Sequence, residues 1–403
     1  MKVVQINAVY QYSSTGKLTE EMHEYMLSKG VQSYVFCTNW NDPSKGIFKI
    51  GNKFDYKLHG LFSRIFGKQG YFSTIPTSRL IKKLNDIEPD VVVLGNLHGN
   101  YINLPKLLQY LGNNNVPTLL ILHDCWFFTG HCCYYVEDNC DKWKSECNRC
   151  PALKKYNKSL FFDTSTKLFY DKKKLFSSIK NLTIVGVSEW IKNEAKESVV
   201  LSNASRFERI YNWLNLDLFK PKDASLIRDE LGIKKDDFVI IGVSQIWNEY
   251  KGFGRFIRLA ESRPNYKIYL VGRVPEKTKL PSNLVSLGEI NNPERLALLY
   301  NMADVFLNFS IQETFGKVSA EAVACGTPII TNTITANPEL CGEGCGKIVD
   351  ITNWESVLEA VDILSTEGKV AYTTRCVQFA RDNFEKTGRL NDYFQLIKDI
   401  INK

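Results

Sequence analysis

Two glutamates, Glu313 and Glu321, lie eight positions apart in the stretch SIQETFGKVSAEAVACGTPII, residues 310–330. Carboxylates paired in this way can act as general acid and general base. The run DVFLNFS before them is typical of a strand, IQETFG of a loop, and KVSAEAVAC of a helix that stops at Gly326. We therefore expect Glu313 in a loop at a strand end and Glu321 one turn into the following helix.

This placement argues against a shared role for the two carboxylates. Hydrolysis of a glycosidic bond needs two carboxyl groups about 5 to 9.5 Å apart on opposite sides of that bond. A loop glutamate and a glutamate on the helix behind it line the same wall, so a glycoside hydrolase is a weak candidate. The amides at the helix start, around Gly316, can instead receive an anion or a hydroxyl-rich ligand, since glycine lets the backbone approach closely.

Short apolar runs alternate with amphipathic helical stretches along the chain, which predicts βαβ units and doubly wound parallel sheets. The runs are KVVQINAV, QSYVFC, DVVVLGN, PTLLILHD and NLTIVGVS, then FVIIGVS, YKIYLVG, LVSLGEI, VFLNFS, PIITN and GKIVD. The pattern breaks near NWLNLDLFKPKD. We expect two Rossmann-like α/β domains that face a central cleft, residues 1–215 joined by a C-terminal helix over 386–403, and residues 216–385.

Composition is that of a soluble protein. The 403 residues, 44% hydrophobic and 24% charged, suffice for two domains with their own cores. No apolar run approaches the roughly 18 residues that cross a bilayer. The start MKVVQINAVY lacks the features of a signal peptide. We therefore expect a cytoplasmic protein.

The positive charge is concentrated in residues 151–180. Eight lysines and two aspartates give this segment a net charge of +6, against +7 for the whole chain. Aromatic residues interleave with the lysines, so the segment can lie on an anionic membrane surface. The alternative, which the pattern favours, is a solvated helix with its apolar face on the core. Nucleic acid is a weak candidate partner because no known nucleic-acid-binding motif accompanies the positive charge.

Six of the eleven cysteines lie between Cys125 and Cys150. In the cytoplasm they should be reduced. Four of them have a loose metal-ligand spacing that ends in C-x2-C: Cys132, Cys140, Cys147 and Cys150. A structural zinc site is one interpretation, and free thiols or a disulfide-bonded loop are the alternatives.

The stretch ETFGKVSAEAVACGTPII resembles the E-x7-E signature of retaining GT-B glycosyltransferases, above all glycosyltransferase family 4. Four further stretches resemble the bacterial branch that makes capsular and colanic-acid-type exopolysaccharides: PTLLILHDCWFFTGHC, VGVSEWIKN, IYNWLNLDLFKP and WNEYKGF. The resemblance covers nearly the whole chain. It implies a GT-B fold and a nucleotide sugar as co-substrate, with no separate cofactor and no metal.

The resemblance also implies residue roles on the donor side. Glu313 would hold the hydroxyls of the donor sugar, and Glu321 would hold the ribose of the nucleotide. Lys251, in YKGF, would neutralise the diphosphate leaving group. The amides of Thr314, Phe315 and Gly316 would orient the sugar.

Two departures from the family pattern concern this side. An arginine is usual several positions before Lys251, but Gln245 or Trp247 stands there, and Arg273 is the candidate to compensate. In TANPEL, residues 335–340, Thr335 to Asn337 replace two glycines.

The first domain would supply the acceptor side. His98 ends a predicted strand in VLGNLHGNY, where a histidine of the family contacts the donor sugar. His123, which precedes Asp124 at the end of TLLILHD, is the next candidate. Gly16 lies in SSTGK, which we expect to be the loop after the first strand, where family members carry a glycine-rich turn. This run lacks the spacing of a P-loop.

The expected function is retaining transfer of a sugar, from a UDP-sugar in preference to a GDP-sugar, to a glycan or lipid-linked acceptor. The setting would be bacterial surface polysaccharide synthesis at the inner membrane face, with peripheral contact through residues 151–180. A carbohydrate phosphorylase on the same fold is one alternative. A non-catalytic protein that binds sugar nucleotides or a membrane surface is another, although the presence of Glu313, Glu321 and Lys251 argues against a dead site.

Overall fold

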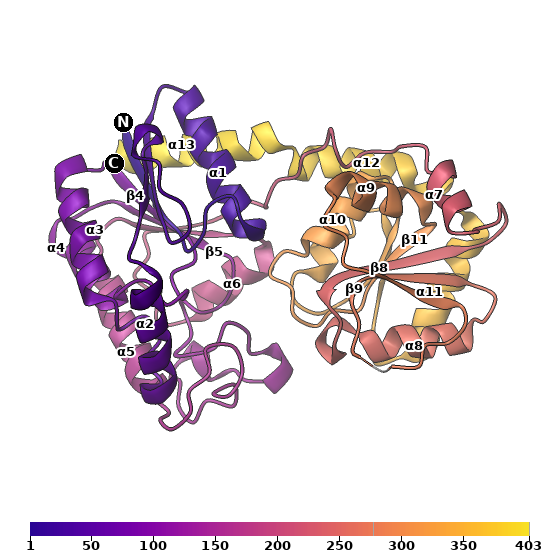
Figure 1. Cartoon of the computed structure of the whole chain (residues 1–403), viewed down its shortest axis with the longest axis horizontal. Helices are drawn as coiled ribbons and strands as arrows, with labels where there is room; N and C mark the ends of the chain where they lie inside the picture. Colours follow the sequence, from indigo (N-terminus) through magenta and orange to yellow (C-terminus); the bar gives the residue numbers. More distant parts are fainter. Residues whose placement is uncertain (277, 403) are drawn as a thin grey trace. The chain divides into compact units, whose positions relative to one another are not determined.

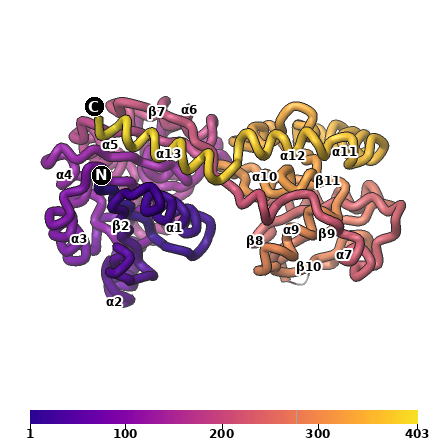
Figure 2. Tube along the Cα trace, turned by 90° about the horizontal axis from the view of Figure 1, so that it is seen from above, coloured from indigo at the N-terminus to yellow at the C-terminus, as the bar shows by residue number. Residues whose placement is uncertain are grey.

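The structure, a computed structural model, describes residues 1–276 and 278–402. The chain forms two compact units, Met1–Ile210 with the stretch from Leu390 onward, and Tyr211–Arg389. Each unit contains one parallel sheet with helices packed around it (Figures 1 and 2). The predicted fold class, two doubly wound α/β domains, is confirmed. None of the described helices is long and apolar enough to cross a membrane.

The N-terminal unit has a seven-stranded sheet in the order β3-β2-β1-β4-β5-β6-β7. The strands are β1 (Lys2–Ile6), β2 (Gln32–Cys37), β3 (Ile47–Lys49), β4 (Val91–Leu94), β5 (Thr118–Leu122), β6 (Leu182–Gly186) and β7 (Arg206–Arg209). Each of the five predicted runs forms a strand. The two edge strands, β3 and β7, were not predicted. All four β7 residues are half-buried, so β7 lacks the continuous apolar run of a central strand.

Within residues 1–276 and 278–402, seven helices belong wholly or largely to this unit. They are α1 (Ser13–Ser28), α2 (Lys53–Phe66), α3 (Thr74–Ile87), α4 (Leu104–Asn113), α5 (Ser165–Ser177), α6 (Glu189–Glu197) and α13 (Lys386–Ile401). The last part of α13, yellow in Figure 2, lies against elements from much earlier in the chain. The side-chain amide of Asn181 donates to the carbonyl of Ile400 at 3.1 Å, and Arg206 pairs with Asp399 at 3.3 Å.

The C-terminal unit has a six-stranded sheet in the order β10-β9-β8-β11-β12-β13. The strands are β8 (Val239–Ile246), β9 (Lys267–Arg273), β10 (Leu284–Gly288), β11 (Val305–Asn308), β12 (Ile329–Asn332) and β13 (Gly346–Val349). The helices are α7 (Ser225–Glu230), α8 (Phe253–Ser262), α9 (Pro293–Met302), α10 (Lys317–Ala324), α11 (Trp354–Glu367) and α12 (Val370–Phe384). All six predicted strands of this half are present, and α10 is the helix predicted after ETFG.

The strand order of each sheet reverses once, between β1 and β4 in the first unit and between β8 and β11 in the second. In open parallel sheets the connections on the two sides of such a switch point diverge, and ligands bind beyond the carboxyl ends of the strands there. The residues that follow these four strands are therefore the first place to look for a site.

The segment between β5 and α5, residues 123–164, is mostly irregular, with two short turns at Val136–Asp138 and Lys142–Lys144. All eleven cysteines, each in the described part of the chain, are unpaired. The thiols of Cys132 and Cys150 lie near enough to influence each other's ionisation. Within residues 1–276 and 278–402, however, no three of the four cysteines suggested for zinc have sulfurs within 4.8 Å of one another. This is not the geometry of an assembled zinc site.

Residues 151–180 do not form one continuous helix. Only α5, from Ser165, is helical, and its buried residues include Leu168, Phe169 and Phe176. Lys172 is buried with them. Its ammonium donates to the carbonyls of Trp126 and Thr129, and it lies 3.9 Å from the centre of the Trp126 ring. One of the eight lysines of the basic segment therefore has a structural place in the core.

Candidate functional site

Lys251 is positioned by a short turn after β8. The side-chain oxygen of Asn248 accepts from the amide of Lys251 at 3.0 Å, which closes the turn Glu249–Lys251. Gly252 follows with φ of 77°. A Cβ atom at this position would lie 2.3 Å from Cβ of Phe309, so only glycine lets this turn pack against the end of β11. The turn thereby places Lys251 at the β8/β11 switch point.

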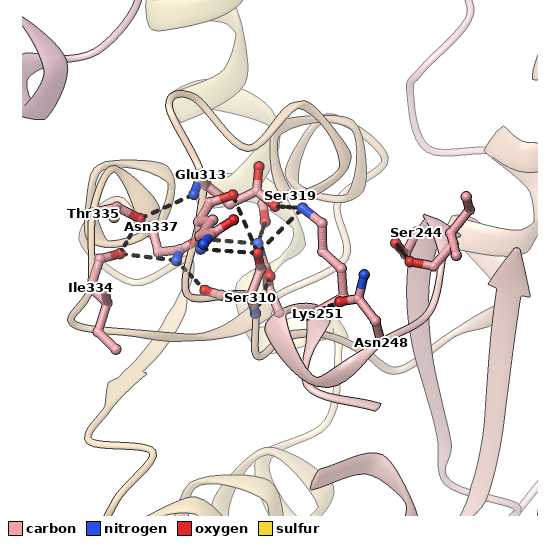
Figure 3. A network of polar contacts seen from close by, with 12 residues as sticks. Ser244, Asn248, Lys251, Ser310, Glu313, Ser319, Ile334, Thr335 and Asn337 are labelled. Carbon is pink, nitrogen blue, oxygen red and sulfur yellow. Dashed lines mark hydrogen bonds and ion pairs between the residues drawn. The ribbon is translucent and has the colours of Figure 1, made fainter. Parts of the chain in front are cut away.

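Glu313 lies in the loop after β11, and the structure brings it to Lys251. The ammonium of Lys251 is 2.6 Å from Oε1 of Glu313 and 3.3 Å from the hydroxyl of Ser310 (Figure 3). The Lys251 side chain is 33% exposed and that of Glu313 17% exposed. This is a charge-assisted hydrogen bond at a position that solvent can still reach.

A buried network of side-chain amides holds the Glu313 loop. The amide nitrogen of Asn308, the last residue of β11, donates to the Ser319 hydroxyl at 2.9 Å and to the side-chain oxygen of Asn337 at 3.0 Å. Asn337 in turn donates to the carbonyl of Ser310 at 2.7 Å (Figure 3). Satisfied buried amides of this kind fix a loop firmly. Sequence reasoning missed them, although asparagines that end apolar strands, in VFLN and IITN, were the available signal.

Thr335 contacts the backbone of Glu313, whose side chain pairs with Lys251. Its hydroxyl accepts from the amide of Glu313 at 3.3 Å, and the amide of Ala336 donates to the Glu313 carbonyl at 3.2 Å. Thr335 has φ of 57°, the left-handed region that favours glycine. The departure from the glycines of the family pattern therefore places a side-chain hydroxyl against the backbone of Glu313.

The start of α10 lies directly after this loop. Thr314, Phe315 and Gly316 are buried, and Gly316 begins the helix with φ of 89°. The Phe315 ring packs at 5.9 Å from Tyr211 and 5.6 Å from Phe384. Phe315 therefore anchors the loop through its side chain, which leaves its backbone as the part that can face a ligand.

Glu321 occupies a different environment from Glu313. Its residue is 6% exposed, and Oε2 accepts from the hydroxyl of Tyr300 at 3.0 Å. Oε1 lies 3.7 Å from the ammonium of Lys317. The structure thus gives the two glutamates separate partners, as their spacing predicts.

Arg273 ends β9 and pairs with Glu289 at 3.1 Å on the surface. Of the two residues that stand in the place of the family's arginine, Trp247 is buried and its indole donates to the carbonyl of Val271 at 3.0 Å. Gln245 is exposed. The structure therefore does not bring Arg273 into an ion pair with Glu313, and Trp247 has a structural role.

A second group of predicted residues follows β4 and β5 of the N-terminal unit. Nε2 of His98 lies 2.7 Å from Oδ2 of Asp124 and 3.8 Å from the sulfur of Cys133. The other oxygen of Asp124 accepts from the amide of Trp126 at 2.8 Å. Nδ1 of His98 has no hydrogen-bond partner within residues 1–276 and 278–402 and is not sealed from solvent.

The electrostatics of this group favour an ion pair. Burial alone would lower the pKa of His98, but Cys133 and Asp124 outweigh it and raise that pKa well above the ordinary value. Burial would raise the pKa of Asp124, and the opposing effect of His98 together with its hydrogen bond leaves it lowered. We therefore describe His98 as an imidazolium whose free Nδ1–H can donate to a ligand.

His98, Asp124 and Cys133 are also the only group of three metal-ligating side chains with ligand atoms within 4.8 Å of one another in the described ranges, 1–276 and 278–402. Two donors on one tetrahedral zinc ion, each about 2.0 to 2.2 Å from it, would lie about 3.3 Å apart. The separation of 2.7 Å between His98 and Asp124 is shorter and fits a hydrogen bond. The geometry therefore favours a hydrogen-bonded pair over a metal centre.

His123 and Gly16 differ from their predicted settings. Burial lowers the pKa of His123 to about 4, so this ring is neutral near pH 7, and Asp124 next to it is the residue that pairs with His98. The prediction of a loop at Ser13 to Lys17 is wrong, because α1 begins at Ser13. A Cβ atom on Gly16 would lie 3.2 Å from Val9 and 3.3 Å from the amide of Gln11, so the glycine allows the β1–α1 connection to pack on the helix.

Part of the chain is similar to known glycosyltransferases. Residues 223–382 match the family described as Glycosyl transferases group 1. The D-inositol 3-phosphate glycosyltransferase of Mycobacteroides abscessus is 29% identical over 205 residues, which are 47% of this chain and 46% of that protein. The alpha-monoglucosyldiacylglycerol synthase of Acholeplasma laidlawii is 34% identical over 148 residues, 32% of this chain and 37% of that protein. The chain thus spans less than half the length of these curated relatives.

Among solved structures, a sucrose-phosphate synthase from Thermosynechococcus elongatus superposes with a TM-score of 0.68. The match covers 100% of this chain and 99% of the other at 15% identity. At this identity the likeness concerns the fold, and it confirms the GT-B type of two Rossmann-like domains.

Proposed function

We propose that this protein is a glycosyltransferase that moves a sugar from a nucleotide diphosphate sugar to a glycan or lipid-linked acceptor. The observation that carries the proposal is the Lys251–Glu313 pair at the switch point of the unit that matches the group 1 family. The two curated relatives support the reaction class, since one is named for glycosyl transfer to inositol 3-phosphate and the other for synthesis of a glucosyldiacylglycerol.

Lys251 is the residue that would stabilise the leaving group. When the bond between the anomeric carbon and the phosphate oxygen breaks, its electron pair stays on the nucleotide diphosphate. A fixed ammonium and the amides at the start of α10 meet this developing charge without reorganisation. Because these groups supply positive charge, we propose that the reaction needs no metal.

Glu313 would hold hydroxyls of the donor sugar next to the reacting carbon. In the structure its carboxylate pairs with Lys251, so a bound donor would place its sugar on the carboxylate and its diphosphate on the ammonium. Glu321, already held by Tyr300, would accept from the ribose hydroxyls. In this way each of the two carboxylates positions one part of the donor and neither transfers a proton.

We propose retention of the anomeric configuration, with UDP as the favoured carrier and GDP as the next. The acceptor hydroxyl attacks from the face that the phosphate leaves, and its proton passes to the departing phosphate oxygen. His98, with its free Nδ1–H, would donate a hydrogen bond to the sugar or the phosphate. The proposed setting is synthesis of a bacterial surface polysaccharide on a lipid-linked acceptor at the inner membrane face.

The test is release of nucleotide diphosphate from UDP- and GDP-sugars, with and without candidate acceptors. Slow donor hydrolysis without acceptor and a raised melting temperature with millimolar UDP are the expected results. The Glu313→Ala variant should lose transfer and keep UDP binding, whereas equal loss of both would remove the role given to Glu313. Proton NMR of the product reads the anomeric configuration directly.

The same assay separates the alternatives. A carbohydrate phosphorylase would release sugar phosphate from a glycan when inorganic phosphate is added, and would not need a nucleotide. A binding protein would gain thermal stability with UDP-sugars without consuming them. If no nucleotide or nucleotide sugar changes the melting temperature, the proposed function is wrong.

A further inference from the structure

Helix α2 of the N-terminal unit exposes a row of large apolar side chains. The buried residues of this helix are His59 and Ser63, both polar. Four large apolar side chains of the helix are nevertheless exposed, with exposed fractions from 39% to 71%: Phe54, Leu58, Leu61 and Phe66. A surface helix ordinarily buries its apolar side and exposes its polar side.

Polar anchors explain why the helix sits this way. Nδ1 of His59 contacts the hydroxyl of Ser73 at 2.7 Å, and the amide of Gly70 donates to Nε2 at 3.3 Å. These contacts fix the inner side of α2. Phe54, Leu58 and Leu61 then follow the spacing i, i+4, i+7 and form one outward row.

Residues 160–162 extend this row. The amide of Leu160 donates to the carbonyl of Arg64 at 2.7 Å, and the rings of Phe66 and Phe162 stack at 6.3 Å. Leu160, Phe161 and Phe162 are 50%, 72% and 53% exposed. We call the outward side of α2 together with residues 160–162 the α2 surface; its helix is labelled in Figure 1.

Basic side chains border the α2 surface. Lys53, Lys57 and Arg64 are exposed at i, i+4 and i+11, along one edge of the apolar row. Lys154 and Lys158, just before residues 160–162, are also exposed. The one acidic residue of α2, Asp55, is engaged in capping, since its carboxylate accepts from the amide of Asn52 at 2.9 Å. The border of the surface is therefore positive.

We propose that the α2 surface docks this protein on an anionic lipid bilayer. Exposed aromatic and aliphatic side chains enter the boundary between headgroups and acyl chains, and lysine and arginine beside them pair with anionic headgroups. An isolated apolar patch on a soluble chain marks a contact site, and its basic border favours an anionic occupant over a neutral one. The significance for a lipid-linked acceptor rests on the proposed function, but docking itself does not.

The proposal changes which part of the basic segment makes contact. From the sequence, membrane contact through residues 151–180 as a whole was one interpretation, yet Lys172 of α5 is buried and Lys167 pairs with Asp171. Of that segment, only residues 160–162 belong to the α2 surface, and Lys154 and Lys158 lie on its border. The rest of the surface comes from α2, which the charge pattern did not single out.

The test is cosedimentation of the full chain with vesicles of phosphatidylcholine, alone or with about 30% phosphatidylglycerol. The wild-type chain should sediment with the anionic vesicles and leave them as salt rises. The partition coefficient of the double variant Leu58→Glu/Leu61→Glu on anionic vesicles should be at least about tenfold lower than that of the wild-type chain. The matched control is Leu226→Glu/Val370→Glu, which changes two apolar residues of the C-terminal unit that are 83% and 88% exposed, and it should bind as the wild type does.

Three outcomes would overturn the proposal. The wild-type chain would not bind anionic vesicles, or the α2 variant would bind as well as its control. In the third, sedimentation without lipid would show a dimer that Leu58→Glu/Leu61→Glu separates, which would assign the surface to a second copy of this chain. All substituted residues are exposed, so an unchanged melting temperature should verify folding. Release of nucleotide from a UDP-sugar in solution should be unchanged in the α2 variant, which keeps failure of docking distinct from failure of the proposed function.

Discussion

Each unit of this molecule holds a cation paired with a carboxylate beyond the ends of its strands, but in different surroundings. In the C-terminal unit, Lys251 and Glu313 meet at 2.6 Å, and a third of the lysine side chain is exposed. In the N-terminal unit, His98 and Asp124 meet at 2.7 Å, with exposed fractions of 21% and 13%. The first pair is more open to solvent at its lysine end, and the second is more enclosed.

The difference indicates what each pair is able to do. Lysine is a compact charge on a flexible stem, so Lys251 can exchange Glu313 for a diphosphate. The His98 ring is rigid and is held on one nitrogen by Asp124, which leaves only Nδ1 for a ligand. We infer that the open pair meets changing charge during the reaction, while the enclosed pair presents one fixed hydrogen-bond donor.

The largest effect should come from removing the open pair's cation. Lys251→Ala should lower kcat by about 100- to 1000-fold, because charge on the leaving diphosphate then develops without a fixed ammonium. Steady-state release of nucleotide from a UDP-sugar measures this. Lys251→Arg is the matched control, and it should retain more activity because it keeps the charge. A loss below about tenfold in Lys251→Ala would mean that other groups carry this charge.

Removing the carboxylate of the enclosed pair should lower kcat less than the loss of Lys251 does. It should change the pH dependence of kcat more. In Asp124→Asn, only Cys133 still opposes the effect of burial on His98, so the pKa of His98 should fall and the ring should be less charged near neutral pH than in the wild type. We expect kcat to fall about 10- to 100-fold and to recover partly at lower pH. NMR titration of His98 gives the pKa without reference to activity. An unchanged pKa would show that Asp124 does not set the charge of the ring.

The same variant has a defined effect on stability. The raised pKa of His98 stabilises the fold at low pH, and this contribution is lost as pH rises through the folded-state pKa. The lowered pKa of Asp124 stabilises above its unfolded-state value, and this contribution is lost as pH falls. The free energy of unfolding lost in Asp124→Asn should therefore be greatest between about pH 4 and 6.5. Urea unfolding at pH 5 and pH 9 tests this.

The positions of Lys251 and Glu313 could be predicted from the sequence, but their ion pair was not, because it depends on β8 and β11 being neighbours in the sheet. Apolar β-branched runs define β8 and β11, and Lys251 and Glu313 follow them within short motifs. The enclosed pair was predicted only in part. His98 and Asp124 belong to different strand ends, and their contact depends on β4 and β5 being neighbours in the sheet, which no local pattern encodes.

Three other features were also hidden, for related reasons. The burial of Lys172 depends on carbonyls of a distant irregular loop. The asparagine network around Ser310 depends on loops after β11 and β12 folding together. The orientation of α2 depends on polar anchors on other segments, so its apolar row reads in the sequence as an ordinary inward-facing helix.

Lys172 tests how the burial of an ammonium group affects the stability of the N-terminal unit. Burial lowers the pKa of Lys172 to about 7. Between about pH 7 and 10.5 the unfolded chain binds a proton that the folded chain does not, so stability should rise with pH by up to about 1.4 kcal/mol per unit. Lys172→Met should flatten this rise in urea unfolding at pH 7 and pH 9.5. Lys174→Met, on an exposed side chain of the same helix, is the control and should leave the slope unchanged.

The smallest effect should come from Arg273, the residue proposed to assist Lys251. Its side chain is 57% exposed and pairs with Glu289 on the surface, so Arg273→Ala should change kcat/KM by less than about twofold and the free energy of unfolding by less than about 0.5 kcal/mol. A tenfold loss of kcat/KM with unchanged stability would show that Arg273 turns toward the diphosphate when the donor binds. The leaving diphosphate would then be met by two cations, Lys251 and Arg273. The side chains that move when the donor binds would include Arg273 at the end of β9.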